Sequence, residues 1–259
     1  MNRRVLITND DGIDAPGLRV LADAARQEGL DVVVAAPAEE ASGTSAAMAA
    51  YTERGRVPIT RTELAGLDGV PAYGVGASPA YIVVLATLDA FGPAPDLVLA
   101  GINRGANAGR AILHSGTVGA AFTAAAYGMR ALAASLDVLS PLSVERGGNA
   151  LQILDETSDA ERHWSTAATW VRKLLPQLRD GLVLNLNVPD RPADEVKGLE
   201  RATLAAFGQV QMAVAESGED FVRLAVEENR ARADRGTDLA LLTDGYATVT
   251  TVRPFAEVT

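Results

Sequence analysis

Short apolar runs alternate with Ala-rich, helix-like stretches through the first two thirds of the chain. Several of these runs are apolar at every position, which is typical of strands covered on both faces of a parallel sheet. We predict strands at residues 4–8, 31–36, 96–100, 131–135 and 182–187, and helices at 16–28, 79–91, 117–127 and 164–178. This alternation predicts an α/β fold with a mostly parallel sheet and flanking helices.

The last third of the chain follows a different pattern. Two stretches of alternating polarity, 209–215 and 221–227, flank the turn-like sequence Glu216-Ser217-Gly218-Glu219 and predict a β-hairpin. Residues 138–162 mix Pro, Gly, Ser and charged residues without a clear period, which indicates a surface insertion. An α/β sheet can fill 259 residues as one unit, so we expect residues 1–259 to form a single domain.

Composition narrows the classes of partner. Hydrophobic residues make up 48% of the chain but aromatic residues only 5%, so the core must consist mainly of Ala, Val, Leu and Ile. There are 33 acidic and 23 basic residues, and no Lys/Arg run is long enough to bind a duplex, so polymeric nucleic acid is not expected as the main partner. A phosphate substrate would need compensation from a metal ion or from N–H groups at a helix end.

The chain contains no Cys, which excludes disulfides and thiol catalysis. Its first apolar stretch, Val5-Leu6-Ile7, is followed after Thr8 by Asn9-Asp10-Asp11 and is too short for a signal peptide or a membrane span. We therefore expect a cytoplasmic protein without a membrane partner.

Three loops that follow predicted strands are rich in oxygen-bearing side chains. Ligands of open parallel sheets bind beyond the carboxyl ends of the strands, so these loops are the first candidates for a site. They contain Asn9, Asp10 and Asp11; Ser42 to Ser45; and Asn103 and Asn107 between alternating glycines at 101–109. Alternating Gly lets the backbone approach a ligand while the Asn amides bond to it, and the alternative for 101–109 is a flexible loop.

The Asp10-Asp11 pair has two interpretations. Asp-Asp-Gly is a common turn sequence. Adjacent carboxylates at the end of a strand, however, repel each other unless a cation or a proton lies between them. Asp, Ser and Asn oxygens suit Mg²⁺, Mn²⁺ or Ca²⁺, whereas zinc prefers His or Cys, and the chain has two His and no Cys.

Ser115-Gly116-Thr117 comes directly before a predicted helix. It is either an ordinary N-cap or a site where helix N–H groups bind an anion such as a phosphoryl group. His114 is adjacent and could donate a proton to a leaving group, and His163 lies at another helix start, although a structural role is the alternative for both. The sequences that mark dinucleotide binding, a P-loop and a nucleophile elbow are missing.

Several motifs in order resemble those of the survival protein SurE family of nucleotidases. They are Val5 to Ile13, Ala36-Pro37 with Ser42-Gly43, Gly101-Ile102-Asn103 with Gly105 and Asn107, Ser115 to Val118, Asn185 to Pro189, Gly236-Thr237-Asp238 and Gly245-Tyr246. The resemblance implies a Rossmann-like fold and divalent-metal-dependent hydrolysis of nucleoside 5′- and 3′-monophosphates. It also implies a hairpin, here 209–227, that is exchanged within a homodimer or a dimer of dimers.

Carried over position by position, the resemblance makes Asp10, Asp11, Ser42 and Asn103 ligands of one Mg²⁺ or Mn²⁺ per subunit, with Ca²⁺ possible in a crystal. It places Asn9, Asn107, Ser115, Gly116 and Thr117 at the phosphate, and makes Asp10, Asp11 and Asn107 catalytic. Activation of water by an Asp and a covalent aspartyl-phosphate remain alternatives. Rival functions are a phosphatase for another small phosphate ester and a nucleotide-binding homologue without catalysis.

The chain departs from the family pattern near the second strand and before the second helix. Ala38 replaces a common Asp, and Ala41 replaces a polar or basic residue. The usual Gly-Thr-Pro-x-Asp segment reads Ala77-Ser78-Pro79-Ala80-Tyr81. These departures leave the four metal-site residues in place and leave substrate preference and assembly open.

Overall fold

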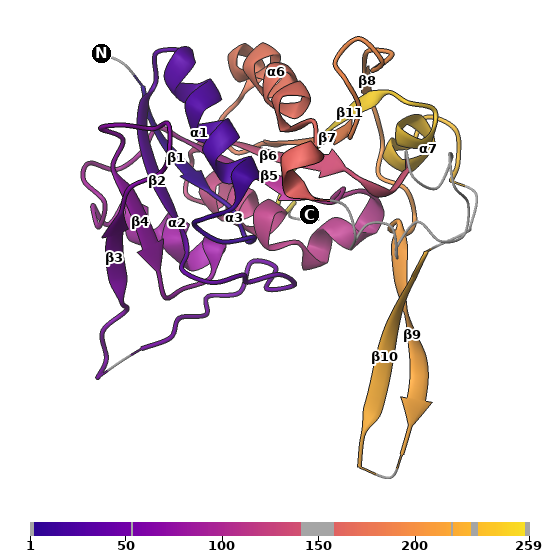
Figure 1. The fold of residues 1–259 in the computed structure, drawn as a ribbon, viewed down its shortest axis with the longest axis horizontal. Helices are drawn as coiled ribbons and strands as arrows, with labels where there is room; N and C mark the ends of the chain where they lie inside the picture. Colours follow the sequence, from indigo (N-terminus) through magenta and orange to yellow (C-terminus); the bar gives the residue numbers. More distant parts are fainter. Residues whose placement is uncertain (1–2, 53, 141–157, 219, 229–232, 257–259) are drawn as a thin grey trace.

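The computed structural model of the chain describes residues 3–52, 54–140, 158–218, 220–228 and 233–256. A nine-stranded sheet forms its middle layer, with helices on both faces (Figure 1). The strands lie in the order β3-β4-β2-β1-β5-β6-β7-β11-β8. Their bounds are β1 (Arg4–Thr8), β2 (Asp31–Pro37), β3 (Ile59–Thr62), β4 (Ala72–Val75), β5 (Leu97–Arg104), β6 (Arg130–Asp137), β7 (Val183–Pro189), β8 (Leu199–Arg201) and β11 (Ala247–Val252).

The six strands from β4 to β7 in this order run parallel to one another. Strand β3 is antiparallel to β4, and β11 is antiparallel to β7 and parallel to β8. This mixed, mostly parallel sheet with flanking helices confirms the predicted Rossmann-like α/β class. In the described part of the chain, no helix is long and apolar enough to cross a membrane.

Each face of the sheet is covered by a pair of helices. Helices α1 (Pro16–Gln27) and α6 (Trp164–Leu174) cover one face, and α2 (Pro79–Thr87) and α3 (Gly116–Ala126) cover the other. A short helix, α7 (Asp238–Thr243), packs near β7 and β11. The 3-10 helices are η1 (Gly109–His114), η2 (Asp159–Glu161) and η3 (Leu175–Gln177).

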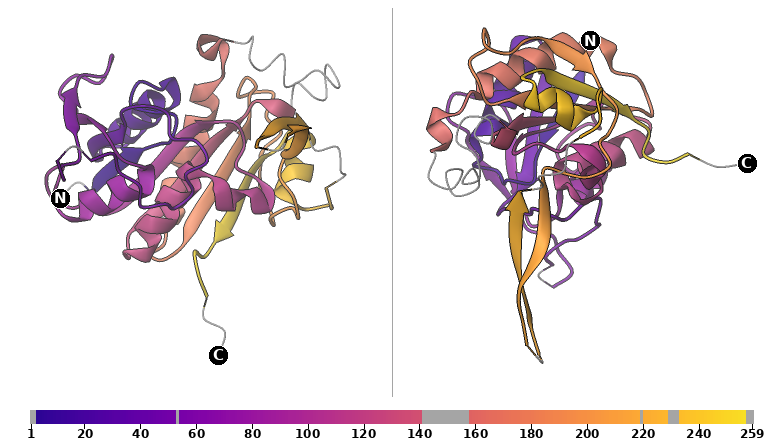
Figure 2. Two further views of the ribbon diagram at one scale, coloured as in Figure 1. Left: turned by 90° about the horizontal axis from the view of Figure 1, so that it is seen from below. Right: turned by 90° about the vertical axis from the view of Figure 1, so that its right-hand side faces the viewer.

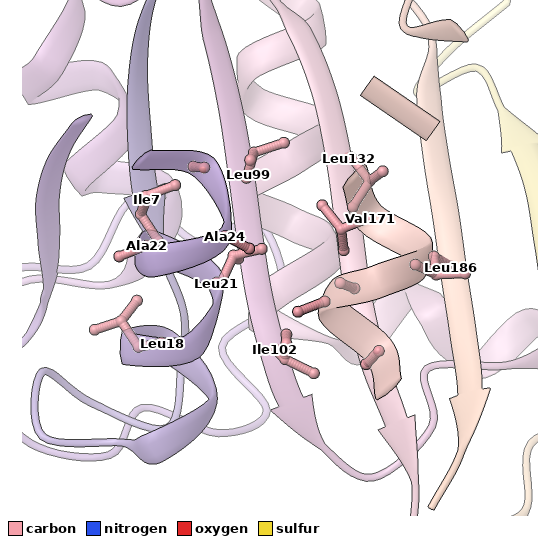
Figure 3. Packing of buried hydrophobic residues seen from close by; sticks show 14 of the residues in the cluster. Ile7, Leu18, Leu21, Ala22, Ala24, Leu99, Ile102, Leu132, Val171 and Leu186 are labelled. Carbon is pink, nitrogen blue, oxygen red and sulfur yellow. The ribbon is translucent and has the colours of Figure 1, made fainter. Parts of the chain in front are cut away.

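Alternation along the buried strands supplies side chains to both faces. In β1, Ile7 joins the core beneath α1 and α6, whereas Leu6 joins the core beneath α2 and α3. Figure 3 shows Leu18 and Leu21 of α1 and Val171 of α6 over the first face. These contacts fix the ends of the central strands, from which the site is built.

The predicted strands and helices are all present, with altered ends. The helix predicted at 79–91 ends at Thr87, because Asp89 and Gly92 both adopt positive φ. The helix predicted at 164–178 changes to a 3-10 turn after Leu174. The strand predicted at 96–100 continues to Arg104, so Asn103 belongs to β5 rather than to a loop.

The predicted hairpin is present and extends away from the sheet (Figure 2). Strand β9 (Val210–Ser217) pairs antiparallel with β10 (Val222–Glu228). Glu216 and Ser217 belong to β9 rather than to the turn, because Ser217 pairs with Val222 and Glu216 pairs with Arg223. The predicted exchange of this hairpin between subunits stays a prediction.

Most of the predicted insertion, residues 141–157, lies outside the described residues. On one side of it, Val138 and Leu139 are buried. On the other side, the buried Arg162 pairs with Asp159 and Asp190. Both flanks are therefore anchored in the body of the molecule, and the surface insertion stays a prediction.

Candidate active site

The site lies where the order of the strands reverses. Strand β1 has β2 on one side and β5 on the other, and such a switch point is the usual ligand position of an open α/β sheet. A cleft of about 540 Å³ opens there. Residues from all three predicted loops line it, namely Asp10, Asp11, Ser42, Asn103 and Asn107, together with Ser115 of the Ser-Gly-Thr sequence.

Asp10 is held by the start of helix α3. Its carboxylate accepts hydrogen bonds from the Thr117 hydroxyl and, at 3.1 Å, from the Thr117 backbone N–H. Burial raises the pKa of Asp10, and the hydrogen bonds from Thr117 lower it in part. The positive end of the helix dipole also favours a carboxylate. The group at the predicted helix-start site is therefore the carboxyl group of Asp10.

Gly116 allows this close approach. A Cβ on Gly116 would lie 2.7 Å from Asp10 Oδ2 and 2.9 Å from Thr44 Oγ1. Ser115 caps the helix in the ordinary way, because its Oγ accepts from the Val118 N–H at 3.0 Å. The ordinary N-cap therefore describes Ser115, and phosphate binding at this helix start stays a prediction.

Asp11 lies at the cleft surface and differs from Asp10 in its environment. Its Oδ2 accepts a hydrogen bond from the Arg104 backbone N–H at 3.2 Å. Burial, followed by the negative charges of Asp10 and Glu40, raises the pKa of Asp11 to about 7. The guanidinium of Arg104 reaches Asp159 at 3.4 Å. The two adjacent carboxylates therefore form a site that favours a proton or a cation.

Asn103 and Ser42 add neutral oxygens to the same cleft. Asn103 Nδ2 donates to the Gly105 carbonyl at 2.8 Å, and Asn103 Oδ1 lies 3.4 Å from Thr117 Oγ1, on the side of Asp10. The exposed Ser42 hydroxyl donates to Glu40 Oε1 at 2.6 Å.

This donor set fits a hard divalent ion that keeps several waters. Within the described ranges, no group of three or more His, Cys, Asp or Glu is arranged to hold a metal. An ion at the cleft would therefore have two carboxylates, one amide and one hydroxyl as protein ligands. These are oxygen ligands only, which agrees with the chemistry expected of Mg²⁺ or Mn²⁺.

Asn107 is fixed by the neighbouring strands. Its backbone N–H donates to Asn187 Oδ1 at 2.8 Å, and its carbonyl accepts from Asn185 and Asn187 at 2.8 and 2.9 Å. Its side-chain amide donates to Ser135 Oγ at 2.9 Å. The part of the predicted 101–109 loop around Asn107 is therefore fixed by hydrogen bonds and does not match the flexible alternative.

Two residues expected at the phosphate lie behind the cleft surface. Asn9 is fully buried, and its amide donates to the Gly12 carbonyl at 3.0 Å, which holds the turn that follows β1. Thr117 is also fully buried and directs its hydroxyl and its N–H to Asp10. Both side chains therefore fix neighbouring parts of the site, Asn9 the turn after β1 and Thr117 the carboxyl group of Asp10.

The two histidines occupy different places. His114 is exposed and lines the cleft. His163 Nδ1 lies 3.0 Å from Asp190 Oδ1, and the His163 backbone N–H donates to the same oxygen at 2.8 Å. The structural alternative therefore describes His163.

Several residues that shape the cleft have no role predicted from the sequence. Glu40, Asp159, Trp164 and Val210 line it, while Asn185, Asn187, Ser135 and Asp238 hold its loops. A signal existed for Asn185 and Asn187, because two amides alternate with apolar residues in an otherwise apolar strand. Asp238 accepts from the Gly109 N–H at 2.8 Å, across 129 positions of sequence, and no local pattern predicts that contact.

Known proteins resemble this chain over nearly its whole length. A family model described as survival protein SurE matches residues 5–211. A 5′-nucleotidase SurE from Aeromonas hydrophila is 31% identical over 255 residues, covering 95% of this chain and 90% of the relative. A 5′/3′-nucleotidase SurE from Shigella dysenteriae is 31% identical over 258 residues, covering 96% of this chain and 90% of the relative.

A solved structure agrees with the family match. The crystal structure of the SurE protein from Aquifex aeolicus superimposes with a TM-score of 0.66 and 28% sequence identity, covering 98% of this chain and 94% of that chain. The sequence motifs, the cleft at the switch point of the sheet and the two kinds of similarity all agree. The chain belongs to the SurE family.

Proposed function

We propose that this protein is a phosphoric monoester hydrolase that converts nucleoside 5′- and 3′-monophosphates to nucleoside and phosphate with the help of a divalent ion. Relatives about as long as this chain are named 5′-nucleotidase and 5′/3′-nucleotidase SurE. The observation that carries the proposal is the pair Asp10 and Asp11 at the cleft, together with the amide of Asn103 and the hydroxyl of Ser42.

These four residues would hold one Mg²⁺ or Mn²⁺. When bound, the ion supplies positive charge to the phosphate oxygens and makes a nearby water more acidic. The N-terminus of α3 orients Asp10 through Thr117, and the two hydrogen bonds from Thr117 favour the ionised carboxylate against the effect of burial. The protein as a whole is acidic, so the positive charge of the bound ion is needed to attract a phosphate.

Asp11 is the better candidate to exchange a proton during hydrolysis. Asp10 has both carboxylate oxygens engaged by Thr117 and is 4% exposed. Asp11 lies at the cleft surface, where its carboxylate can accept a proton from an attacking water. A direct attack by Asp11 on phosphorus is the alternative, since the same exposure serves a nucleophile.

Other groups at the cleft suit the phosphate and the leaving group. Asn107 and Ser115 line the cleft and carry groups that can bond to phosphate oxygens. His114 is exposed at the same cleft and can give a proton to the oxygen that leaves. These roles follow from position and chemistry together.

We also propose that the hairpin of β9 and β10 packs against a second copy of the chain. Val214, Phe221 and Val222 expose 63%, 52% and 59% of their surface. A two-stranded hairpin alone is marginal in water, and a partner subunit would cover these side chains.

A panel of phosphate esters tests the proposed substrate class. With Mg²⁺ or Mn²⁺ present, phosphate release from nucleoside 5′- and 3′-monophosphates is expected to exceed release from glycerol phosphate and from simple alkyl phosphates. The Asp11→Asn variant, checked for folding by circular dichroism, should lose this activity. A faster reaction with another ester would show that this ester is the preferred substrate. The lack of any turnover would contradict the proposed hydrolysis and favour a nucleotide-binding homologue without catalysis.

A further inference from the structure

A second hollow lies next to the cleft, toward the β3 edge of the sheet. It has a volume of about 770 Å³ and lies between the chain that follows β2 and strands β3 and β4. Its wall consists largely of small apolar groups, among them Ala38, Ala41, Ala50, Ala77 and Pro58. A volume of this size is typical of sites that enclose an organic molecule.

The two hollows are neighbours, and one segment separates them. Glu40 lines both. The Ala41 N–H donates to the Asp10 carbonyl at 2.7 Å, so the wall of the second hollow is bonded directly to the metal-site loop. Thr44 also lines the second hollow and lies beside Gly116, at the start of α3. A molecule whose phosphate lies in the cleft can therefore extend past Glu40 into the second hollow.

The charge of the wall selects the part of the substrate that enters. No Lys or Arg is among the described residues that line the second hollow, and Glu39 and Glu40 contribute carboxylates. These charges repel a phosphate and accept hydrogen bonds from hydroxyl or amino groups. Tyr51 adds an aromatic ring that is 70% exposed, against which a flat ring can stack.

We propose that this second hollow binds the nucleoside part of the substrate, with its aromatic base against the apolar wall near Tyr51. The inference rests on the proposed function and adds the site that determines which phosphate ester is preferred. Three of the positions at which this chain departs from the family pattern, Ala38, Ala41 and Ala77, lie in this one wall. These three departures from the family pattern therefore lie where the nucleoside would bind, and the residues of the proposed metal site are unchanged.

Filling the hollow tests the inference. Ala38 and Ala49 are exposed residues of the wall. Ala38→Leu and Ala49→Leu therefore each place a larger side chain in the hollow and reduce its free volume without changing the core. Ala193→Leu is the matched control, because Ala193 is exposed and lines neither hollow. The substrates are AMP and ribose 5-phosphate, which share the phosphate and the sugar but differ in the base. Circular dichroism verifies the fold of each variant.

In each filled variant, kcat/KM for AMP is expected to fall about tenfold, the equivalent of about 1.4 kcal/mol, while kcat/KM for ribose 5-phosphate stays the same. Binding of adenosine, followed by calorimetry with a chelator present, should weaken to the same degree. Equal changes for both substrates, or no change in AMP turnover and adenosine binding, would overturn the inference. If the wild-type protein hydrolyses neither ester, the proposed function fails, and adenosine binding still tests the hollow separately.

Discussion

At the residue scale, Asp10 and Asp11 are neighbours in sequence with different tasks. The start of α3 donates two hydrogen bonds to the Asp10 carboxylate, whereas Asp11 lies at the cleft surface and its pKa is raised to about 7. Desolvation and the nearby carboxylates oppose the charge on Asp11, so an ion in the cleft would relieve the same repulsion that raises its pKa. This contrast leads to a pH dependence that can be measured without substrate.

With a chelator present, the free energy of unfolding is expected to decrease as the pH rises from about 4 to about 7, by at most about 1.4 kcal/mol per pH unit from Asp11. Unfolded Asp loses its proton near pH 4, whereas folded Asp11 keeps it until about pH 7, so over this range the folded state binds more protons. The Asp11→Asn variant should lose this contribution. Urea titrations at several pH values measure the unfolding free energy of both proteins. An identical dependence of this free energy on pH in the two proteins would contradict a raised pKa of Asp11.

Thr117 offers a second test at the residue scale. Thr117→Val removes the hydroxyl bond to Asp10, so Mg²⁺ affinity measured by calorimetry should fall about tenfold or more, with tenfold the lower end of the effect of a hydrogen bond to a charged group. Thr123→Val is the control, because the Thr123 hydroxyl bonds only within α3, to the Gly119 carbonyl. Equal metal affinities in the two variants would show that Thr117 does not hold Asp10 for the ion.

At the element scale, the buried parallel strands could be predicted because they are apolar throughout. Strands β3, β4 and β8 are short, with three or four residues each, and no long run marks them. Strand β11 joins the sheet beside β7 through contacts distant in sequence, and its Thr residues weaken the apolar signal. The loops proposed to hold the metal could be named from the sequence because each follows a predictable strand. The supports of Asn107 could not, since hydrogen bonds 78 and 80 positions apart leave no local pattern.

Strand β7 positions Asn107, and this role can be separated from stability. Asn187→Ala removes two hydrogen bonds to the Asn107 backbone and should lower both the unfolding free energy, by about 2–4 kcal/mol, and kcat. Leu186→Ala is matched in strand and burial but contacts the core, so it should cost stability without a comparable loss of kcat per folded molecule. Urea unfolding and kcat are measured for both. Equal kcat values in Asn187→Ala and Leu186→Ala would show that Asn187 does not position Asn107 for the reaction.

At the scale of the whole molecule, the extended hairpin implies a partner. We expect a homodimer or a dimer of dimers by light scattering, and a Val214→Asp/Val222→Asp double variant should shift the mass to that of a monomer. Leu88→Asp is the control, since Leu88 is an apolar residue with 71% exposure outside the hairpin. A wild-type monomer at micromolar concentration, or a double variant that still assembles, would be incompatible with the proposed packing.

The proposed hydrolysis depends on a divalent ion at Asp10, Asp11, Ser42 and Asn103. The most direct measurement is the rate of phosphate release from AMP by one preparation before chelation, after exhaustive chelation with EDTA, and after Mg²⁺ or Mn²⁺ is restored. Because the described cleft combines two carboxylates with neutral oxygens, we predict that activity disappears on chelation and returns with the ion, and that Asn103→Ala recovers only about one hundredth of the rate. Full turnover of AMP after complete removal of metal would contradict the account.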